Sequence, residues 1–179
     1  MRPVAHGDGS DLQGRLRMIA VQATEQIDEP TLRRAVKEDV PEIRALVQRA
    51  YARWVGVTPR PPKPVNADYD RAFGAHRFDL LVHKGELLAL IETVAEGKEL
   101  LIVNVAVDPD RQRKGLGQRL LRHAEDLARA GGLQGTRLYT NALMAPNIAL
   151  YERLGYMRER EVDHGDGMVA VHMVRAFVG

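Results

Sequence analysis

The chain contains no cysteine among its 179 residues. Without a thiol it can form no disulfide, no thiolate metal site and no cysteine nucleophile. Its six histidines show no ligand spacing, so we predict no metal site. Long apolar runs are also missing, because no window reaches the ~20 apolar residues that a membrane-spanning helix needs, and the N-terminus lacks the apolar core of a signal peptide. We therefore expect a cytoplasmic protein that has no membrane partner.

An excess of charge of one sign is absent as well. The chain has 26 basic and 24 acidic residues, a net charge of +2, and the two signs are interspersed. A basic stripe with interleaved aromatic residues, the usual footprint of a nucleic-acid surface, does not occur. We therefore predict no nucleic-acid partner.

The composition predicts one domain. Hydrophobic residues make up 45% of the chain, enough for one substantial core, and no compositional break separates a second block. Residues 1–29 are predicted to be a flexible tail or a tail that docks as a short helix near residues 16–21, because they show no strong cap or strand alternation. The domain is predicted over residues 30–179.

Hydrophobic periodicity and turn residues predict the elements of this domain. A strand at 31–36 is followed by a helix at 41–54, for which Asp39 is the predicted N-cap. After a proline-rich loop and a short helix ending near residue 73, three successive strands joined by short turns are predicted to be antiparallel. These three strands are predicted at 78–83, 86–95 and 100–107. The later elements are predicted to be a long helix after residue 117, a strand at 136–141, a helix at 147–154, and strands at 156–162 and 168–177.

The stretch Asn104–Ala128 contains the clearest functional signal. A short apolar run ends at Asp108-Pro109, and the basic, glycine-containing loop Gln112–Gly117 then begins an amphipathic helix. The first N–H groups of a helix have no internal acceptor and carry partial positive charge, while glycine lets an anion approach the backbone. This loop is therefore predicted to bind a phosphate group.

Two motifs in this order resemble the GNAT superfamily of acyl-CoA-dependent N-acyltransferases. In "VAVDPDRQRKGLG", Gln112, Gly115 and Gly117 fit the family loop Q/R-x-x-G-x-G/A, and in "NIALYERLGY" Tyr151 fits the tyrosine of the later helix. The glycine spacings of a P-loop and of a dinucleotide-binding fold are not present. The resemblance covers roughly residues 31–176. It implies an α/β (α+β) fold with a mixed, mostly antiparallel sheet of six to seven strands, about four flanking helices and splayed strands that form a slot for CoA.

The resemblance implies acetyl-CoA as the co-substrate. Backbone N–H groups of the loop would hold the pyrophosphate, and the strand before the loop would offer backbone groups to the pantetheine amides. For Asn147, simple N-capping of its helix is the alternative, because many relatives carry the corresponding asparagine where this chain has Met144. The implied cofactor-binding residues are Val105, Ala106, Val107, Gln112, Arg113, Lys114, Gly115, Leu116, Gly117, Gln118, Asn147 and Tyr151.

The implied reaction transfers an acetyl group to a primary amine by direct attack within a ternary complex. Tyr151 would donate a proton or hydrogen bond to the CoA sulfur, the alternative being a core tyrosine. Relatives often carry an acid where this chain has Asn104, and an amide accepts no proton at neutral pH, so Asn104 would position a water. Glu92 is the best titratable candidate for the base, followed by His83 and Tyr139. A proton relay to water without a single base also stays open.

The acceptor site is expected between the first two helices, their connecting loop and the late strands. Its predicted residues are Trp54, Tyr51, Tyr69, Tyr139 and Asn141, with packing in the core as the alternative for the aromatic ones. The sequence does not separate a small-molecule amine from a peptide amine. Because Asn104 stands where relatives often carry an acid, a second function also stays open, that of a CoA-binding sensor or scaffold without useful turnover. The family resemblance is compatible with a homodimer.

Overall fold

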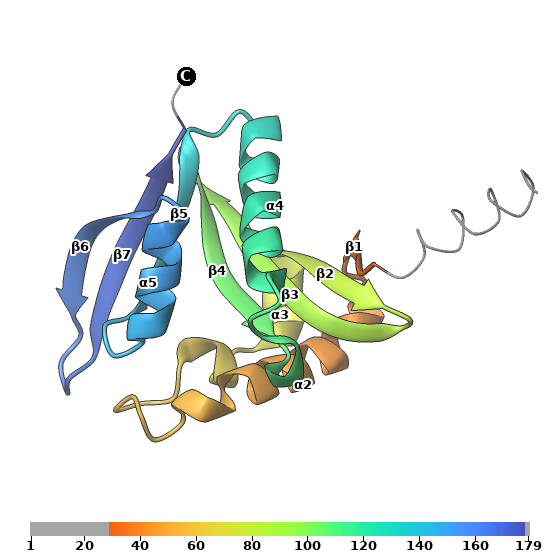
Figure 1. Ribbon diagram of the computed structural model, residues 1–179, viewed down its shortest axis with the longest axis horizontal. Helices are drawn as coiled ribbons and strands as arrows, with labels where there is room; N and C mark the ends of the chain where they lie inside the picture. The colour runs from red at the N-terminus through yellow and green to blue at the C-terminus, as the bar shows by residue number, and fades with distance from the viewer. Residues whose placement is uncertain (1–28, 178–179) are drawn as a thin grey trace, which may run out of the picture. The chain divides into compact units, whose positions relative to one another are not determined.

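Apolar strands form the centre of the structure, a computed structural model that describes residues 29–177. The sheet has seven strands in the order β1-β2-β3-β4-β5-β7-β6, and every neighbouring pair is antiparallel except β4 and β5 (Figure 1). In chain order the elements are β1 (Thr31–Arg34), α2 (Val40–Tyr51), α3 (Tyr69–Ala75), β2 (Arg77–His83), β3 (Glu86–Glu96), β4 (Glu99–Val107), α4 (Leu116–Ala130), β5 (Gly135–Asn141), α5 (Ala145–Arg153), β6 (Met157–Asp163) and β7 (Val169–Ala176). The predicted mixed sheet with four flanking helices is confirmed.

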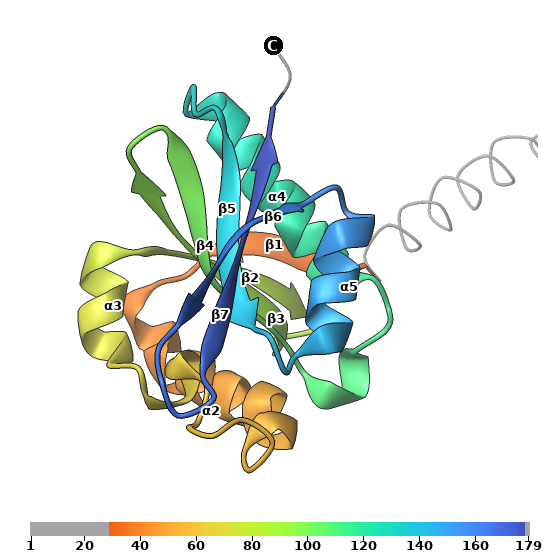
Figure 2. The ribbon, with the colours of Figure 1, turned by 90° about the vertical axis from the view of Figure 1, so that its left-hand side faces the viewer.

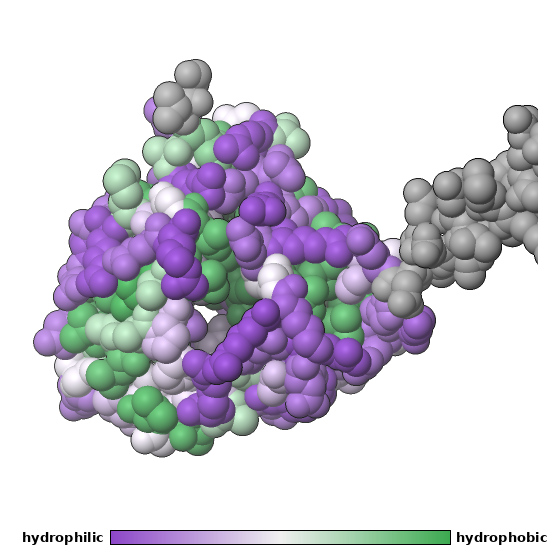
Figure 3. All heavy atoms as spheres, in the orientation of Figure 1, coloured by the Kyte–Doolittle hydropathy of each residue, from purple (hydrophilic) through white to green (hydrophobic). Residues whose placement is uncertain are grey.

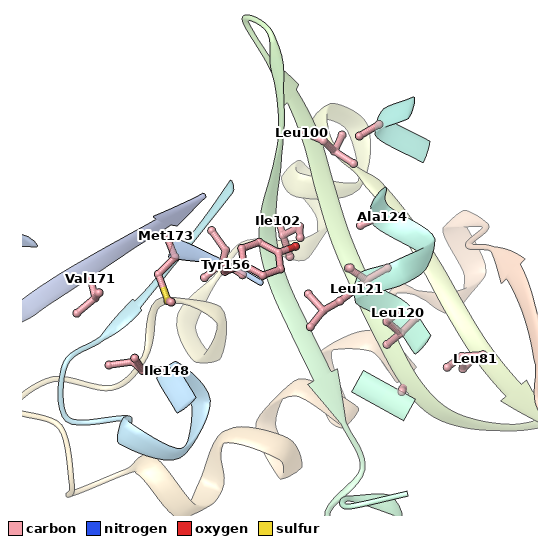
Figure 4. Packing of buried hydrophobic residues seen from close by; sticks show 14 residues of the cluster. Leu81, Leu100, Ile102, Leu120, Leu121, Ala124, Ile148, Tyr156, Val171 and Met173 are labelled. Atoms are coloured by element: carbon pink, nitrogen blue, oxygen red, sulfur yellow. The ribbon is translucent and has the colours of Figure 1, made fainter. Parts of the chain in front are cut away.

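Two apolar cores lie on the two faces of the sheet. On one face α2 packs Ile43, Leu46 and Val47, which share one side of the helix because their spacing is i, i+3, i+4. On the other face Leu120 and Leu121 of α4 pack against β3 and β4, as Figure 4 shows. Figures 1 and 2 show α2 and α3 on one side of the sheet and α4 and α5 on the other. Within residues 29–177, no helix is long and apolar enough to span a bilayer.

The only parallel pairing in the described sheet is short. Residues 99–102 of β4 pair with residues 135–138 of β5. Beyond that point β5 continues along β7, with Tyr139 opposite His172 and Asn141 opposite Ala170. The C-terminal half of β4 therefore has no partner on its β5 side in the described structure, and the sheet opens there. The predicted splayed strands are confirmed.

A β-bulge in β4 sets which residues face each core. Glu92 and Thr93 of β3 pair with Asn104 and Ile102, so Val103 is an extra residue on β4. An extra residue moves the following side chains to the opposite face. Leu100 and Ile102 belong to the core beside α4, whereas Ala106 belongs to the core beside α2 and α3. Asn104 is thereby turned toward α2 and α3.

Two helix starts differ from the sequence prediction. Asp39 occupies the N-cap position of α2 but makes no side-chain capping bond there, because its carboxylate accepts from the Val36 N–H and pairs with Arg33. The helix predicted from Asn147 begins at Ala145, with Pro146 in its first turn, so the alternative that Asn147 is an N-cap is wrong. The tail helix predicted near residues 16–21 lies outside the described residues.

The close approach of β5 and β7 at Gly135 predicts a stability effect. A Cβ atom at this position would lie 2.6 Å from the carbonyl oxygen of Arg175, so Gly135→Ala should lower the free energy of unfolding by about 1–3 kcal/mol. Gly74→Ala in α3 is the matched control, because a Cβ there meets nothing within 4 Å and should be neutral or stabilising. Urea denaturation measures both, and equal stability of the two variants would contradict the packing described.

Candidate active site

A cavity of about 670 Å³ occupies the opening between β4 and β5. The cavity is lined by residues from α2, α3, the loop between them, β3, β4, β5, α5, β7 and the loop that precedes β7. The space-filling view shows a hollow with apolar walls and a polar rim between α5 and β4 (Figure 3). A cavity of this size with a few convergent polar groups is the usual form of a small-molecule site.

The most deeply buried acid in the cavity is Glu92. This β3 residue is 4% exposed, and its Oε1 lies 2.6 Å from Nδ1 of His76, which follows the last turn of α3. Burial raises the pKa of the Glu92 carboxyl, and the hydrogen bond from His76 opposes that rise. The pair joins a carboxylate and an imidazole at the wall of the cavity.

Asn104 forms the centre of a hydrogen-bonded group beneath the cavity. The Tyr51 hydroxyl donates to Asn104 Oδ1 at 2.8 Å, and Asn104 Nδ2 donates to the Tyr69 hydroxyl at 3.4 Å. Tyr69 in turn donates to the carbonyl of Pro64 at 2.7 Å. Because Asn104 is only 3% exposed, this group satisfies an otherwise costly buried amide. It ties β4 to α2, α3 and the loop between them.

Tyr151 lies on α5 at the opposite side of the opening. Its ring packs against Tyr156 with the ring centroids 6.0 Å apart, and its side chain lines the cavity. Burial raises the pKa of Tyr151 to about 12, so the hydroxyl keeps its proton at neutral pH. No hydrogen-bond partner for this hydroxyl occurs among residues 29–177, which makes it an available donor.

The loop before α4 has the form expected of an anion site. Arg113 and Gly115 both have positive φ, +62° and +78°, and Gly115 is the left-handed N-cap of α4. Within the described part of the chain, the backbone N–H groups from Arg113 to Gln118 have no acceptor. Six donors at the positive end of a 15-residue helix can bind a phosphate.

The side chain of Gln112 holds this loop in place. Its Nε2 donates to the carbonyl of Val107 at the end of β4 at 3.2 Å, and its Oε1 accepts from Arg53 at 3.3 Å. The glutamine of the motif thus connects the loop to the strand that lines the cavity.

The structure brings only some of the predicted site residues together. Those that line the cavity are Tyr51, Glu92, Asn104, Val105, Tyr139, Asn141, Asn147 and Tyr151. Trp54, Tyr69 and His83 are not among the lining residues, and Arg53 covers the Trp54 ring at 4.5 Å. Ala106 packs into the core beside α2. Sequence reasoning missed His76, which follows a short helix without any motif.

The comparisons with known proteins identify the family and agree with the fold. Residues 41–156 match the sequence model of the acetyltransferase (GNAT) family. The chain belongs to this family. The sequence-based resemblance is confirmed.

Three relatives of the family illustrate the match. The ribosomal protein bS18-alanine N-acetyltransferase of Escherichia coli (strain K12) is 41% identical over 76 residues, which are 42% of this chain and 51% of that protein. The crystal structure of the Escherichia coli enzyme has a TM-score of 0.66 and 28% identity over 84% of this chain and 96% of its own. Mycothiol acetyltransferase of Clavibacter michiganensis is 33% identical over 132 residues, 70% of this chain and 42% of that protein. The chain thus spans about half the length of the curated relatives it matches.

A further solved structure shares the fold at low identity. The PaiA N-acetyltransferase from Thermoplasma acidophilum, solved in complex with coenzyme A, has a TM-score of 0.65 and 18% identity over 83% of this chain and 99% of its own.

The buried tyrosines predict a loss of stability in alkali. Burial raises the pKa values of Tyr151 and Tyr156 to about 12 from the ordinary value of 10.0. A raised pKa means that the folded state holds the proton more tightly than the unfolded chain. This stabilisation is complete below pH 10 and is lost as the pH rises through about 12. Urea unfolding across this window should show a falling free energy of unfolding, with a shallower fall in Tyr151→Phe. Equal slopes in the two proteins would contradict the burial of this hydroxyl.

Proposed function

We propose that this protein is an N-acetyltransferase that moves an acetyl group from acetyl-CoA to a primary amine of a peptide or a small molecule. The observation that carries the proposal is the opening between β4 and β5, where a cavity holds an acid–imidazole pair and a tyrosine donor, and where the chain leads from the end of β4 to the open amides before α4. Membership of the acetyltransferase (GNAT) family supports it.

Acetyl-CoA, the donor, would bind along the open part of β4 and the loop before α4. Open N–H groups at the start of α4 suit a pyrophosphate, and Arg113 and Lys114, both exposed, add positive charge there. The unpaired half of β4 suits the amides of pantetheine, which would pair with it as an added strand does. The thioester would then lie in the cavity near Val105 and Tyr151, and a β4 backbone group would polarise its carbonyl.

The chemistry requires two protons to leave the acceptor nitrogen. An alkyl amine is protonated at neutral pH and cannot attack until a base takes one proton. Attack then forms the C–N bond, and breaking of the C–S bond releases the CoA sulfur. Tyr151 supports this step because its protonated hydroxyl can donate to the sulfur, which finally carries the second proton. The first proton leaves through the base to solvent.

Asn104 would act by positioning. Its amide accepts no proton at neutral pH, and its two described hydrogen bonds fix Tyr51 and Tyr69. Tyr51 reaches the cavity wall from α2, where its hydroxyl also lies 3.5 Å from the carbonyl oxygen of Val105. This arrangement favours a role for Asn104 in shaping the acceptor side of the cavity.

Thiol release in a screen of primary amines tests the function. Purified protein with acetyl-CoA and a panel of short peptides, polyamines and aminoglycosides should release free CoA with at least one acceptor. Binding of acetyl-CoA without thiol release across the whole panel would instead favour a CoA-binding sensor or scaffold.

Tyr151→Phe tests the assigned donor. This variant should lower kcat with the best acceptor by about 10²-fold or more, because the leaving sulfur loses its proton source. Acetyl-CoA affinity, measured by calorimetry, should stay the same because the pyrophosphate loop is untouched. Tyr156→Phe is the matched control, since the Tyr156 hydroxyl bonds Thr136 and is not among the cavity-lining groups. Unchanged turnover in Tyr151→Phe would remove Tyr151 from the mechanism.

A further inference from the structure

We propose that His76 is the general base of the transfer and that Glu92 is a positioning residue that acts through it. The proposal rests on the proposed function and names the group that receives the first proton. It replaces the direct role that the sequence assigns to Glu92.

The geometry separates the two roles. Nδ1 of His76 is engaged by Glu92 Oε1 at 2.6 Å, while Nε2 has no hydrogen-bond partner among residues 29–177. His76 is the more accessible member of the pair, since its side chain is 29% exposed and that of Glu92 is 5% exposed. Both residues line the cavity. The imidazole is therefore more accessible to an acceptor amine than the carboxylate is.

The chemistry of the pair suits proton abstraction. A carboxylate that accepts from Nδ1–H leaves Nε2 as the unprotonated nitrogen of a neutral imidazole. When Nε2 takes a proton from the acceptor ammonium, the buried anion beside it stabilises the imidazolium that forms. The N–H bond of the ammonium breaks, an N–H bond forms at Nε2, and the neutral amine keeps the electron pair that attacks the thioester. Solvent then takes the proton from the imidazolium, because the His76 side chain is 29% exposed.

The end of α3 and strand β3 hold His76 and Glu92 in place. His76 has an extended backbone, φ −116° and ψ 161°, directly after α3, and its N–H caps the helix at Ala72. Glu92 lies opposite Asn104 in the β3–β4 register, so the carboxylate sits at the level of the sheet where β4 carries its only amide side chain. The pair therefore stands beside the bulge of β4.

Other groups around the cavity define the competing assignments. Burial lowers the pKa of His172, whose ring packs on Tyr139 with the centroids 5.6 Å apart, so this second histidine is the main rival for the role of base. The remaining titratable or charged groups that line the cavity are Tyr51, Lys63, Asp68, Arg71, Tyr139, Tyr151 and His164.

Kinetics of four variants with the best acceptor of the amine screen test the assignment. His76→Gln keeps a side-chain donor for Glu92 but cannot take a proton, so kcat/KM should fall by about 10²–10⁴-fold and should lose the rise with pH that is expected of the parent. In His76→Ala, kcat/KM should fall by a similar factor and should recover in part when imidazole is added. A purely structural role of His76 would not produce this recovery. In Glu92→Gln, kcat/KM should fall by a smaller factor than in His76→Gln. The double variant His76→Gln/Glu92→Gln should be no slower than His76→Gln alone, because Glu92 acts through the imidazole.

The outcomes separate this proposal from the proposed function. Thiol release by His76→Gln with the parent's pH profile, or a larger loss in Glu92→Gln than in His76→Gln, overturns the assignment of the base and leaves the transferase function standing. Loss of the pH dependence in His172→Gln with its retention in His76→Gln also overturns it. Absence of thiol release from the parent protein with every amine overturns both proposals.

Discussion

The short parallel pairing between β4 and β5 is the constraint on which the site depends. Only residues 99–102 and 135–138 pair, and at the start of β5 the backbone of Gly135 is held so close to β7 that a methyl group does not fit. From there β5 follows β7 and leaves β4 with open backbone groups along its second half. Unpaired backbone donors and acceptors inside a protein need partners. A ligand with amides of its own is the natural occupant of such an opening.

The bulge at Val103 determines which side chains of β4 line this opening. Without the extra residue, Asn104 and Ala106 would share the face of Leu100 and Ile102 beneath α4. With it, Asn104 joins α2 and α3 through Tyr51 and Tyr69, and the cavity gains a rigid polar floor. The same register brings Glu92 to the level of Asn104, where His76 can reach it from the end of α3. The polar floor of the cavity and the candidate base thus depend on one irregularity of one strand.

The sequence predicted the parts of the fold and site that local patterns encode. The loop from Gln112 to Gly117 could be predicted as a candidate site because glycine spacing and a helix start are local, and Tyr151 could be predicted from a contiguous helix motif. The bulge was not predicted, because an unbroken apolar run such as "LLIVNVAV" does not reveal which face each residue takes. His76 was missed because its role depends on a contact with Glu92, 16 positions further along the chain. Asp39 occupied its expected position, but Arg33 and the Val36 N–H took the carboxylate that was to cap α2.

Amide hydrogen exchange with and without CoA measures the central claim most directly. If CoA binds along the opening, adding it should slow exchange at the amides within residues 103–107 of β4 that are not bonded to β3, and at the amides of residues 113–118 of the loop. Exchange in residues 99–102 of β4, which pair with both β3 and β5, and in β2 should stay unchanged, because these amides are already bonded within the sheet. Slower exchange confined to other elements, or no change at saturating CoA, would contradict the assignment of this opening as the donor site.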